Sequence, residues 1–324
     1  MQTSARAIAI VTDDPGWHGR QLVKAFAARD CRAAFLRLQD CSFDLAGSAG
    51  IVLGTDWAQL PDAVFVRGVP GGTLEQVILR LDVLHALKLL GVPVYNDGRA
   101  IERTVDKAMT SFLLHRAGVP TPPTWACEDA GQAQARLHAE WAQGHAVVIK
   151  PLFGSQGEGL RRLASGQPLP ALDEYQGVAY LQRFVPPAGG VNRDFRVFVI
   201  GGRVDCAMAR FGTDWINNVA QGARCEAVAA GGDLERLALD AVRVLDMDYA
   251  GVDILIGADG RAQVLEVNSV PAWYGLQSVT EHRIAERLAD DLLRRHVHVP
   301  GRRAGPVQDA ALHAAAGLAL AVGP

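Results

Sequence analysis

The sequence predicts an α/β protein, and two features of its 324 residues carry this prediction. The first third alternates short apolar strands with amphipathic helices, which is the order found in open, mostly parallel sheets. The second half instead contains pairs of strands separated by two-residue turn signals, which indicates antiparallel hairpins. With 49% hydrophobic residues, the chain is long and apolar enough for two or three packed domains.

Charge and cysteine usage exclude several classes of protein. The formal charge is only −3 and no basic block is present, so we expect no nucleic-acid partner. The five cysteines are scattered without a C-x-x-C pair, which favours reduced thiols in a cytoplasmic protein over a disulfide frame or a zinc site. The N-terminus has too short an apolar run for a signal peptide, and no stretch predicts a membrane span.

The first strand, residues 7–11, leads through a polar turn into a helix at 19–29. The turn lies at the carboxyl end of its strand, where ligands bind in such sheets. Its side chains either help to bind an acceptor substrate or form an ordinary capped turn, and both readings stay open. The residues concerned are Asp13, Asp14, Trp17 and His18.

Two helices are expected before a proline-rich linker. Apolar residues recur at helical spacing from Leu74 to Leu87, and Gly91 supplies a stop. A second helix is predicted from about Ala100 to Ala117. Prolines in the segment 119–123 end it and force an extended linker.

A glycine-rich turn follows the next predicted strand. A helix at 128–142 leads into the strand AVVIKP, and the segment FGSQGEGL comes directly after it. Glycines allow backbone N–H groups to approach an anion closely. No Gly-Lys-Ser/Thr follows, and 160–163 returns as a strand, so we predict a glycine-tipped hairpin acting as a mobile lid over phosphates.

Further hairpins and one helix lie between this lid and residue 247. The strand 178–185 breaks at Pro186, and its free backbone groups either read an adenine edge or belong to a simple loop. Two strands flank Gly201-Gly202, a hairpin signal. Asp194 and Arg196 share one face of the first strand, and Arg210 ends the second. A polar loop then precedes a helix at 234–247 that Asp233 is placed to cap.

The segment 251–268 predicts a hairpin about Asp259-Gly260. A two-residue loop there places Asp253 opposite Glu266, and Asn268 on the same face. Facing carboxylates repel unless a cation neutralises them, and Mg²⁺ or Mn²⁺ prefers such oxygen ligands. The alternative is a hairpin with an acidic solvated face. A closing helix is expected at 280–295.

These motifs, in this order and spacing, resemble the ATP-grasp superfamily and within it the RimK-like glutamate ligases. The resemblance rests on VIKP with GSQGEG, DFRVFV, GVDI and LEVNSVP, and covers about residues 60–295. It implies an ATP-grasp fold with an N-terminal Rossmann-like domain at 1–98. Subdomains at 99–186 and 187–298 would bind ATP between them, and a flexible tail would occupy 299–324.

The resemblance also implies a role for each motif. Phosphates would be bound by Lys107 and Lys150 under a lid that includes Gly154, Ser155, Gln156, Gly157 and Gly159. Adenine would be read by Gln182, Arg183, Phe184 and Val185, and ribose by Asp194. Two magnesium or manganese ions would be held by Asp253, Glu266 and Asn268. The catalytic candidates are Arg196, Arg210 and Asn218.

Two departures from the RimK pattern concern specificity. An acid of the adenine linker is replaced by Arg183, and the loop 215–221 lacks arginines beside Asn218. The run 270–276 looks more like the glutamate ligases associated with tetrahydromethanopterin-type cofactors.

The implied reaction joins a carboxylate to an amine at the expense of ATP, through an acylphosphate. The expected partners are ATP, an amino acid such as glutamate, and a carboxylate-bearing small molecule or protein. Membranes are not expected, and a homo-oligomer is possible. The alternatives are a kinase on the same scaffold and a nucleotide-binding sensor without turnover.

Overall fold

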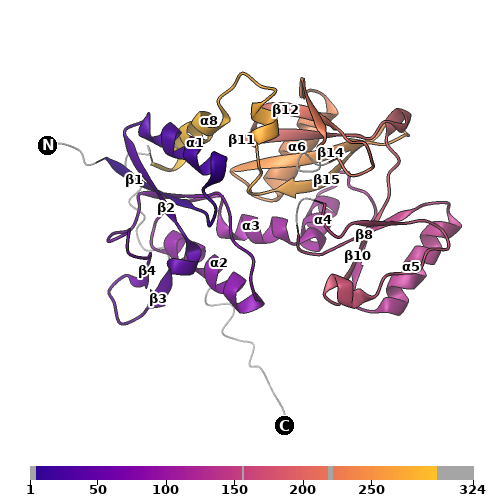
Figure 1. Ribbon diagram of the computed structural model, residues 1–324, viewed down its shortest axis with the longest axis horizontal. Helices are drawn as coiled ribbons and strands as arrows, with labels where there is room; N and C mark the ends of the chain where they lie inside the picture. The colour runs from indigo at the N-terminus through magenta and orange to yellow at the C-terminus, as the bar shows by residue number, and fades with distance from the viewer. Residues whose placement is uncertain (1–4, 155–156, 218–221, 298–324) are drawn as a thin grey trace, which may run out of the picture.

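The computed structural model describes residues 5–154, 157–217 and 222–297. Three sheets follow one another along the long axis of the molecule (Figure 1). The predicted tail at 299–324 lies outside the described residues. No described helix is long and apolar enough to cross a membrane.

The N-terminal sheet is parallel, as predicted, and has the order β2-β1-β5-β6. Its strands are β1 (Arg6–Val11), β2 (Cys31–Leu36), β5 (Ala63–Val66) and β6 (Val94–Tyr95). Side chains alternate between its faces: Ile8 and Ile10 pack with helix α1 (Gly16–Ala27), while Ala9 and Val11 pack with α2 (Leu74–Leu89). A small sheet of β3 (Ser42–Asp44) and β4 (Gly50–Val52) precedes β5, and the 3₁₀ turn η1 (Leu38–Asp40) precedes β3.

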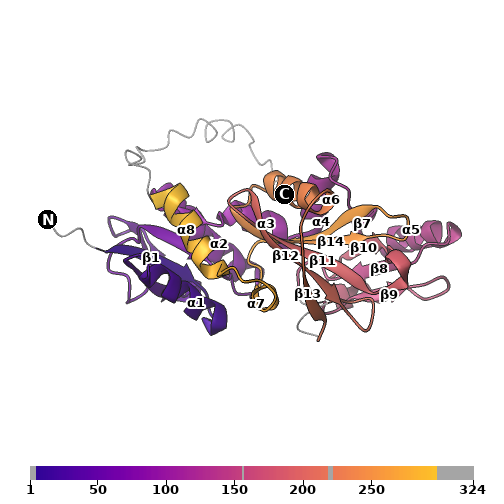
Figure 2. The same ribbon diagram turned by 90° about the horizontal axis from the view of Figure 1, so that it is seen from above.

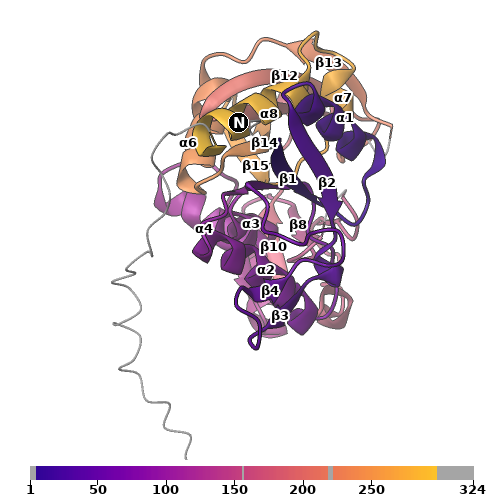
Figure 3. The same cartoon turned by 90° about the vertical axis from the view of Figure 1, so that its left-hand side faces the viewer.

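The last helix of the described chain returns to this first domain. Helix α8 (Ile284–Leu292) runs beside α1 (Figures 2 and 3). Leu288 and Leu292 join the same core as Ile8 and Ile10. Arg29 adds a two-pronged bond to Asp290, at 2.5 and 2.7 Å. The first and last parts of the described chain therefore share one core, which sets the last sheet against the first.

The helix predicted at about 100–117 is two helices, α3 (Gly98–Val105) and α4 (Lys107–Arg116). The break lies at Asp106, whose backbone is extended and whose Oδ1 accepts hydrogen bonds from the N–H groups of Ala108 and Met109, at 2.9 and 3.0 Å. Aspartate competes with the helix in this way and is preferred as an N-cap. The prediction of one helix was therefore wrong, and the cap makes Lys107 the first residue of α4.

The second sheet is antiparallel, with the order β7-β10-β8-β9. Strand β9 returns beside β8, which confirms the predicted hairpin about the glycine-rich segment. The members of this subdomain are β7 (Thr124–Cys127), α5 (Ala130–Ala142), β8 (Val147–Lys150), β9 (Arg161–Leu163), η2 (Leu172–Tyr175) and β10 (Ala179–Arg183).

The third sheet has the order β13-β12-β11-β14-β15 and carries α6 (Asp233–Val244) on one face. Its strands are β11 (Arg193–Ile200), β12 (Arg203–Phe211), β13 (Arg224–Val228), β14 (Tyr249–Ile256) and β15 (Ala262–Asn268). Gly201 and Gly202 both have positive φ, 58° and 74°, as the predicted two-residue turn requires. Asp233 does not cap α6: the helix begins at Asp233, and Gly232 occupies the cap position. The 3₁₀ turn η3 (Ala188–Gly190), helix α7 (Tyr274–Gln277) and the terminal turn η5 (Leu293–Val297) complete the described elements.

The hairpin of β14 and β15 confirms the pairing of Asp253 with Glu266 but corrects the turn. The Gly257 N–H donates to the Arg261 carbonyl at 2.9 Å, so the loop holds three residues and not two. Gly260 has φ 77°, which suits the left-handed position of a three-residue loop. A bulge then places Leu265 as an extra residue between the partners of Asp253 and Ile254. The bulge compensates for the longer loop and restores the predicted register.

Candidate functional site

The site lies on the face of the third sheet opposite α6, where α4 and the end of β8 approach it. A narrow pocket with about 10 Å³ of free volume lies between them. Lys107, Lys150 and Glu266 contribute to its wall, together with Thr104, Ser111, Tyr180 and Leu265. The structure therefore brings together both predicted lysines and one of the two predicted metal-binding acids.

The two lysine side chains reach the pocket from different elements, Lys107 from the start of α4 and Lys150 from the end of β8. Lys107 Nζ donates to the carbonyl of Gly154 at 2.8 Å, and Lys150 Nζ donates to Gln182 Oε1 at 2.7 Å. Burial lowers the pKa of Lys107. Burial also lowers the pKa of Lys150 to about 8, a shift that Glu266 opposes and Lys107 reinforces. Two covered ammonium groups close together favour the binding of a polyanion such as a triphosphate.

Two arginines and two aspartates form a covered charge cluster beside this pocket. Arg210 holds Asp194 by a two-pronged bond at 2.7 and 2.8 Å. Arg196 holds Asp253 in the same way at 2.7 and 2.6 Å, and Arg210 also lies 3.0 Å from Asp253. Burial raises the pKa of Asp194 to about 6 against the opposing effect of Arg210. For Asp253, both arginines outweigh burial and lower the pKa.

The side chains of Asp253, Glu266 and Asn268 have the chemistry that a divalent cation requires of its ligands. Asp253 and Glu266 face each other across β14 and β15. In the orientation that satisfies its partners, the Asn268 amide nitrogen lies 3.2 Å from Glu266 Oε1, and its oxygen lies 3.2 Å from Arg196 Nη2. The three side chains offer only oxygen ligands if the amide turns, as Mg²⁺ prefers. No cluster of three His, Cys, Asp or Glu suited to a metal occurs among the described residues, so any cation rests on two acids and an amide.

The glycine-rich segment packs against the end of β8. Gly154, Gly157 and Gly159 have φ of 143°, 75° and 69°, which L side chains rarely adopt. A Cβ on Gly159 would lie 2.8 Å from the Pro151 ring. Tyr175 donates to the Gly159 carbonyl at 3.0 Å. Ser155 and Gln156 lie outside the described residues, as does Asn218.

The predicted adenine linker divides into side chains with different surroundings. Gln182 faces Lys150, but Arg183 turns to α5 and holds Glu140 by a two-pronged bond at 2.6 and 2.9 Å. The backbone N–H of Arg183 donates to the Pro123 carbonyl at 2.9 Å. Because proline has no N–H, Pro123 cannot donate a hydrogen bond to the Arg183 carbonyl. The structure therefore removes the side chain of Arg183 from the pocket and leaves an adenine role to the backbone. Phe184 lies under the guanidinium of Arg162, at 3.9 Å, and Val185 packs against Gly257.

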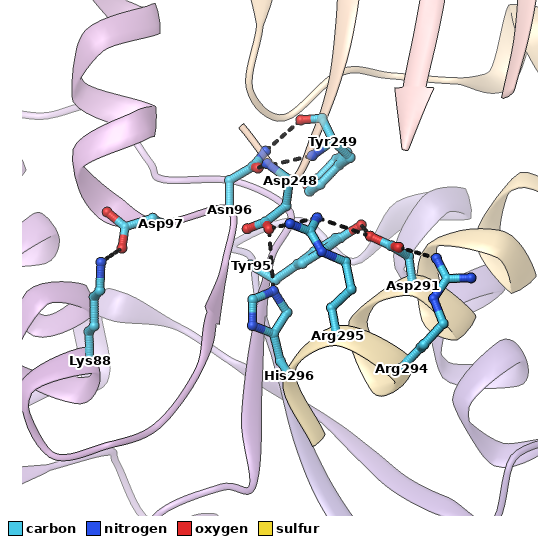
Figure 4. A network of polar contacts seen from close by, with 10 residues as sticks. All are labelled: Lys88, Tyr95, Asn96, Asp97, Asp248, Tyr249, Asp291, Arg294, Arg295 and His296. Atoms are coloured by element: carbon cyan, nitrogen blue, oxygen red, sulfur yellow. Dashed lines mark hydrogen bonds and ion pairs between the residues drawn. The ribbon is translucent and has the colours of Figure 1, made fainter. Parts of the chain in front are cut away.

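Sequence reasoning missed Asn96, a buried residue that fixes the loop after β15. Its Oδ1 accepts from the N–H groups of Asp248 and Tyr249, at 2.7 and 3.1 Å (Figure 4). Its Nδ2 donates to the carbonyls of Tyr249 and Ser269, both at 2.7 Å. No motif surrounds Asn96, and its partners lie more than 150 residues away, so the sequence offers no local signal for this role.

The same close view shows how the domains are tied together around Asn96. Tyr95 OH donates to Asp291 at 2.9 Å, and Asp248 pairs with Arg295 at 3.1 Å and with His296 at 3.3 Å (Figure 4). Lys88 pairs with Asp97, and Arg294 pairs with Asp291. These bonds join β6, the start of β14 and the C-terminal turn.

Residues 104–292 match the family model of the RimK-like ATP-grasp domain. Two curated relatives are tetrahydromethanopterin:alpha-L-glutamate ligases. That of Methanocaldococcus jannaschii is 36% identical over 241 residues, 72% of this chain and 79% of that protein. That of Methanosarcina acetivorans is 30% identical over 308 residues, 82% of this chain and 92% of that protein.

Solved structures support the same fold. The ATP-grasp ligase PsnB complexed with a minimal precursor superposes with a TM-score of 0.68 at 24% identity, covering 90% of this chain and 99% of that chain. A RimK domain ATP-grasp protein from Sphaerobacter thermophilus superposes with a TM-score of 0.64 at 21% identity, covering 88% and 98%. At these identities the likeness shows the fold alone.

Proposed function

This chain belongs to the RimK-like ATP-grasp family, and on that premise we propose that it is an ATP-dependent carboxylate–amine ligase. The proposal extends to an L-glutamate substrate and a small carboxylated cofactor as acceptor, because the relatives with 36% and 30% identity are named for that reaction on tetrahydromethanopterin. PsnB, solved with a peptide precursor, has lower identity, so a protein acceptor is the second choice.

The observation that carries this proposal is the meeting of Lys107 and Lys150 with Glu266 in one pocket, beside the charge cluster at Asp253. Cations and acids of this kind are needed when an anionic carboxylate must approach a triphosphate. Lys107 and Lys150 would bind the phosphates. Asp253, Glu266 and Asn268 would hold magnesium, which supplies charge neutralisation at the phosphates when bound. A PsnB structure contains Mg and ADP, and the number of ions here is left open.

The chemistry then proceeds in two steps. An acceptor carboxylate oxygen attacks the γ-phosphorus of ATP, which releases ADP and leaves an acylphosphate. The amine of glutamate attacks the acyl carbon, phosphate leaves, and the amine proton is lost. Arg196 and Arg210, which both contact Asp253, would stabilise negative charge at the reacting centre once Asp253 turns toward a cation. The glycine-rich segment would exclude water, which hydrolyses acylphosphates.

A coupled assay tests the ligase proposal. The chain is incubated with ATP, magnesium, L-glutamate and tetrahydromethanopterin, and both ADP and inorganic phosphate are measured. Equal release of ADP and phosphate that requires both amine and acceptor, with an amide product in the mass spectrum, supports the proposal. ADP release without phosphate release would identify a kinase, and no ADP release with any carboxylate and amine would identify a nucleotide sensor.

Two finer proposals accompany this one. A cytoplasmic location follows from the need for ATP and from five thiols that are free cysteines in the structure. A homo-oligomer stays a possibility that measurement of the molar mass in solution decides.

A further inference from the structure

Arg67 differs from three other covered arginines near the site, which are all paired with carboxylates. Arg183, Arg196 and Arg210 each hold a carboxylate by a two-pronged hydrogen bond. Arg67 is half-buried, but among the described residues its guanidinium has no ion pair. Its contacts are the carbonyl of Val270, which accepts from Nη1 at 3.0 Å, and the face of the Trp273 ring, 5.3 Å away.

Two covered donors at this position have no acceptor in the described part of the chain. They are Arg67 Nε and Trp273 Nε1. A buried donor without an acceptor destabilises the fold, because it has lost its hydrogen bond to water and gained none in return. Burial also lowers the pKa of Arg67, which shows that the surrounding charges do not offset the loss of water. The acid that opposes this shift is Asp14, which is exposed and therefore screened.

The place of Arg67 in the sheet is one where ligands bind. It directly follows β5, and its N–H donates to the carbonyl of Val11, the last residue of β1, at 2.9 Å. The chain leaves β1 toward β2 on one side and returns to β5 on the other. The carboxyl ends of β1 and β5 are thus a topological switch point, outside which ligands usually bind in such sheets. We refer to this position, beside Arg67, as the crevice.

This crevice is connected to the ATP site through one short loop. Val270, which accepts from Arg67, is two residues beyond Asn268. Pro271 of the same loop packs on Gly251, where an added Cβ would lie 3.0 Å from the proline and 3.5 Å from Arg196 Cδ. A substrate held at Arg67 therefore lies next to the loop that leads from the proposed magnesium ligands.

We propose that Arg67 is the binding site for a substrate carboxylate that does not react. The proposal rests on the proposed ligase function, in which L-glutamate keeps its carboxylates throughout and an acceptor can carry further acidic groups. A guanidinium with free donors is matched to a carboxylate in shape and charge. The amino acid and the acceptor offer the same chemistry, and the experiment distinguishes them.

The rings of Trp17 and Tyr274 stand near the crevice, edge to face at 5.2 Å. Tyr274 is 61% exposed although aromatic rings tend to be covered. His18 lies between Trp17 and Trp273. Its Nε2 accepts from the backbone N–H of Trp273 at 3.1 Å, and burial lowers the pKa of His18 to about 4. A neutral imidazole at this position adds no second positive charge beside Arg67.

The first measurement compares thermal unfolding of three variants of the unliganded full chain. Arg67→Met keeps the contact with Trp273 and removes an uncompensated charge, so we expect the Tm to stay at the wild-type value or rise. Arg183→Met removes the two-pronged partner of the buried Glu140 and lowers the Tm by several degrees. Arg32→Gln is the matched control, because Arg32 also lies over a tryptophan, Trp57, at 5.5 Å, but far from the crevice in an exposed position.

The second measurement is calorimetric binding of L-glutamate and, separately, of tetrahydromethanopterin, each with magnesium and ADP present. Arg67→Met should weaken one of them at least tenfold, while Arg32→Gln binds as wild type. Loss of glutamate affinity assigns Arg67 to the amino acid, and loss of tetrahydromethanopterin affinity assigns it to the acceptor.

Wild-type affinity of Arg67→Met for both ligands overturns the proposal. If the wild type binds neither ligand, the proposed substrates are wrong, and the Tm comparison alone decides on Arg67. In that case a Tm that falls as far as in Arg183→Met shows that Arg67 is a structural residue and overturns the proposal, whereas an unchanged or raised Tm supports it.

Discussion

Arg196 holds the Asp253 carboxylate with both prongs of its guanidinium, Nε to Oδ1 at 2.7 Å and Nη2 to Oδ2 at 2.6 Å. A residue proposed to bind magnesium is thus neutralised by arginines in the unliganded chain. Binding of magnesium and ATP would exchange one positive partner for another, and Arg196 would then be free to face the reacting carboxylate.

Asp253→Asn should reduce magnesium-dependent ADP release on the order of 100-fold or more, because one charged oxygen ligand is lost. The Arg210 bond to Asp194 persists, so circular dichroism should show a folded chain. Asp259→Asn, in the exposed turn of the same hairpin, is the matched control and should keep wild-type turnover. Turnover of Asp253→Asn near the wild-type rate would contradict the metal assignment.

Nucleotide affinity should fall as the pH rises through about 8. The pKa of Lys150 in the folded chain is about 8, and phosphate binds the protonated amine. Above that pH, binding must take up a proton, and the Kd for ADP rises up to about tenfold per pH unit. Lys150→Arg keeps its charge across this range, so its Kd should stay level. A wild-type Kd independent of pH from 7 to 9.5 would refute this prediction.

The lowered pKa of Lys150 also affects the stability of the fold. This effect changes with pH in the direction opposite to that of nucleotide affinity. Between about pH 8 and the ordinary lysine value, the unfolded chain binds more protons at Lys150 than the folded chain does. The contribution of Lys150 to the free energy of unfolding therefore rises with pH in that window. Urea unfolding of wild type and Lys150→Met over this range measures the difference.

Asn96→Asp should lower kcat more than it raises the KM for ATP. The substitution keeps the acceptor for Asp248 and Tyr249 but removes the donor to the Ser269 carbonyl, and so loosens the loop that follows Asn268. Asn96 contacts no proposed substrate group, so it acts by positioning. Asn96→Ala removes all four bonds and should also lower the free energy of unfolding by about 3 kcal/mol. An unchanged kcat in Asn96→Asp would contradict the proposal that Asn96 positions the loop.

Arg183→Met should destabilise the subdomain that contains α5 and β10 without changing adenine binding. Glu140 is only 4% exposed, and loss of Arg183 leaves it with His145, 3.2 Å away. We expect a loss of about 2 kcal/mol in the free energy of unfolding, measured by urea denaturation. Glu140→Leu in the same chain should restore part of it. A large rise in the Kd for ADP in Arg183→Met would instead place its side chain at the nucleotide.

The sequence predicted the elements with strong local signals and the residues whose motifs stand on those elements. The parallel sheet, the hairpin at Gly201-Gly202 and the facing of Asp253 and Glu266 are all found. The last is right although the turn was wrong, because a longer loop and the bulge at Leu265 compensate for each other. Hydrophobic alternation specifies which face a strand buries, but it does not reveal a bulge.

Contacts between distant segments had no sequence signal. The turn of Arg183 toward Glu140, the four bonds of Asn96 and the crevice at Arg67 each depend on how separate elements pack. The break at Asp106 was in principle readable, since aspartate is a common N-cap, but the apolar pattern continues across it. The domain boundaries stay predictions, and so do the roles of Ser155, Gln156 and Asn218, which lie outside the described residues.

The central claim is that an acceptor carboxylate is activated by ATP through an acylphosphate. It is tested most directly by labelling that carboxylate with ¹⁸O and analysing the inorganic phosphate formed with L-glutamate and ATP. The account predicts one ¹⁸O atom in phosphate for each amide bond formed, because the oxygen that attacks the γ-phosphorus leaves with it. Phosphate without ¹⁸O, at equal amide yield, would contradict the account.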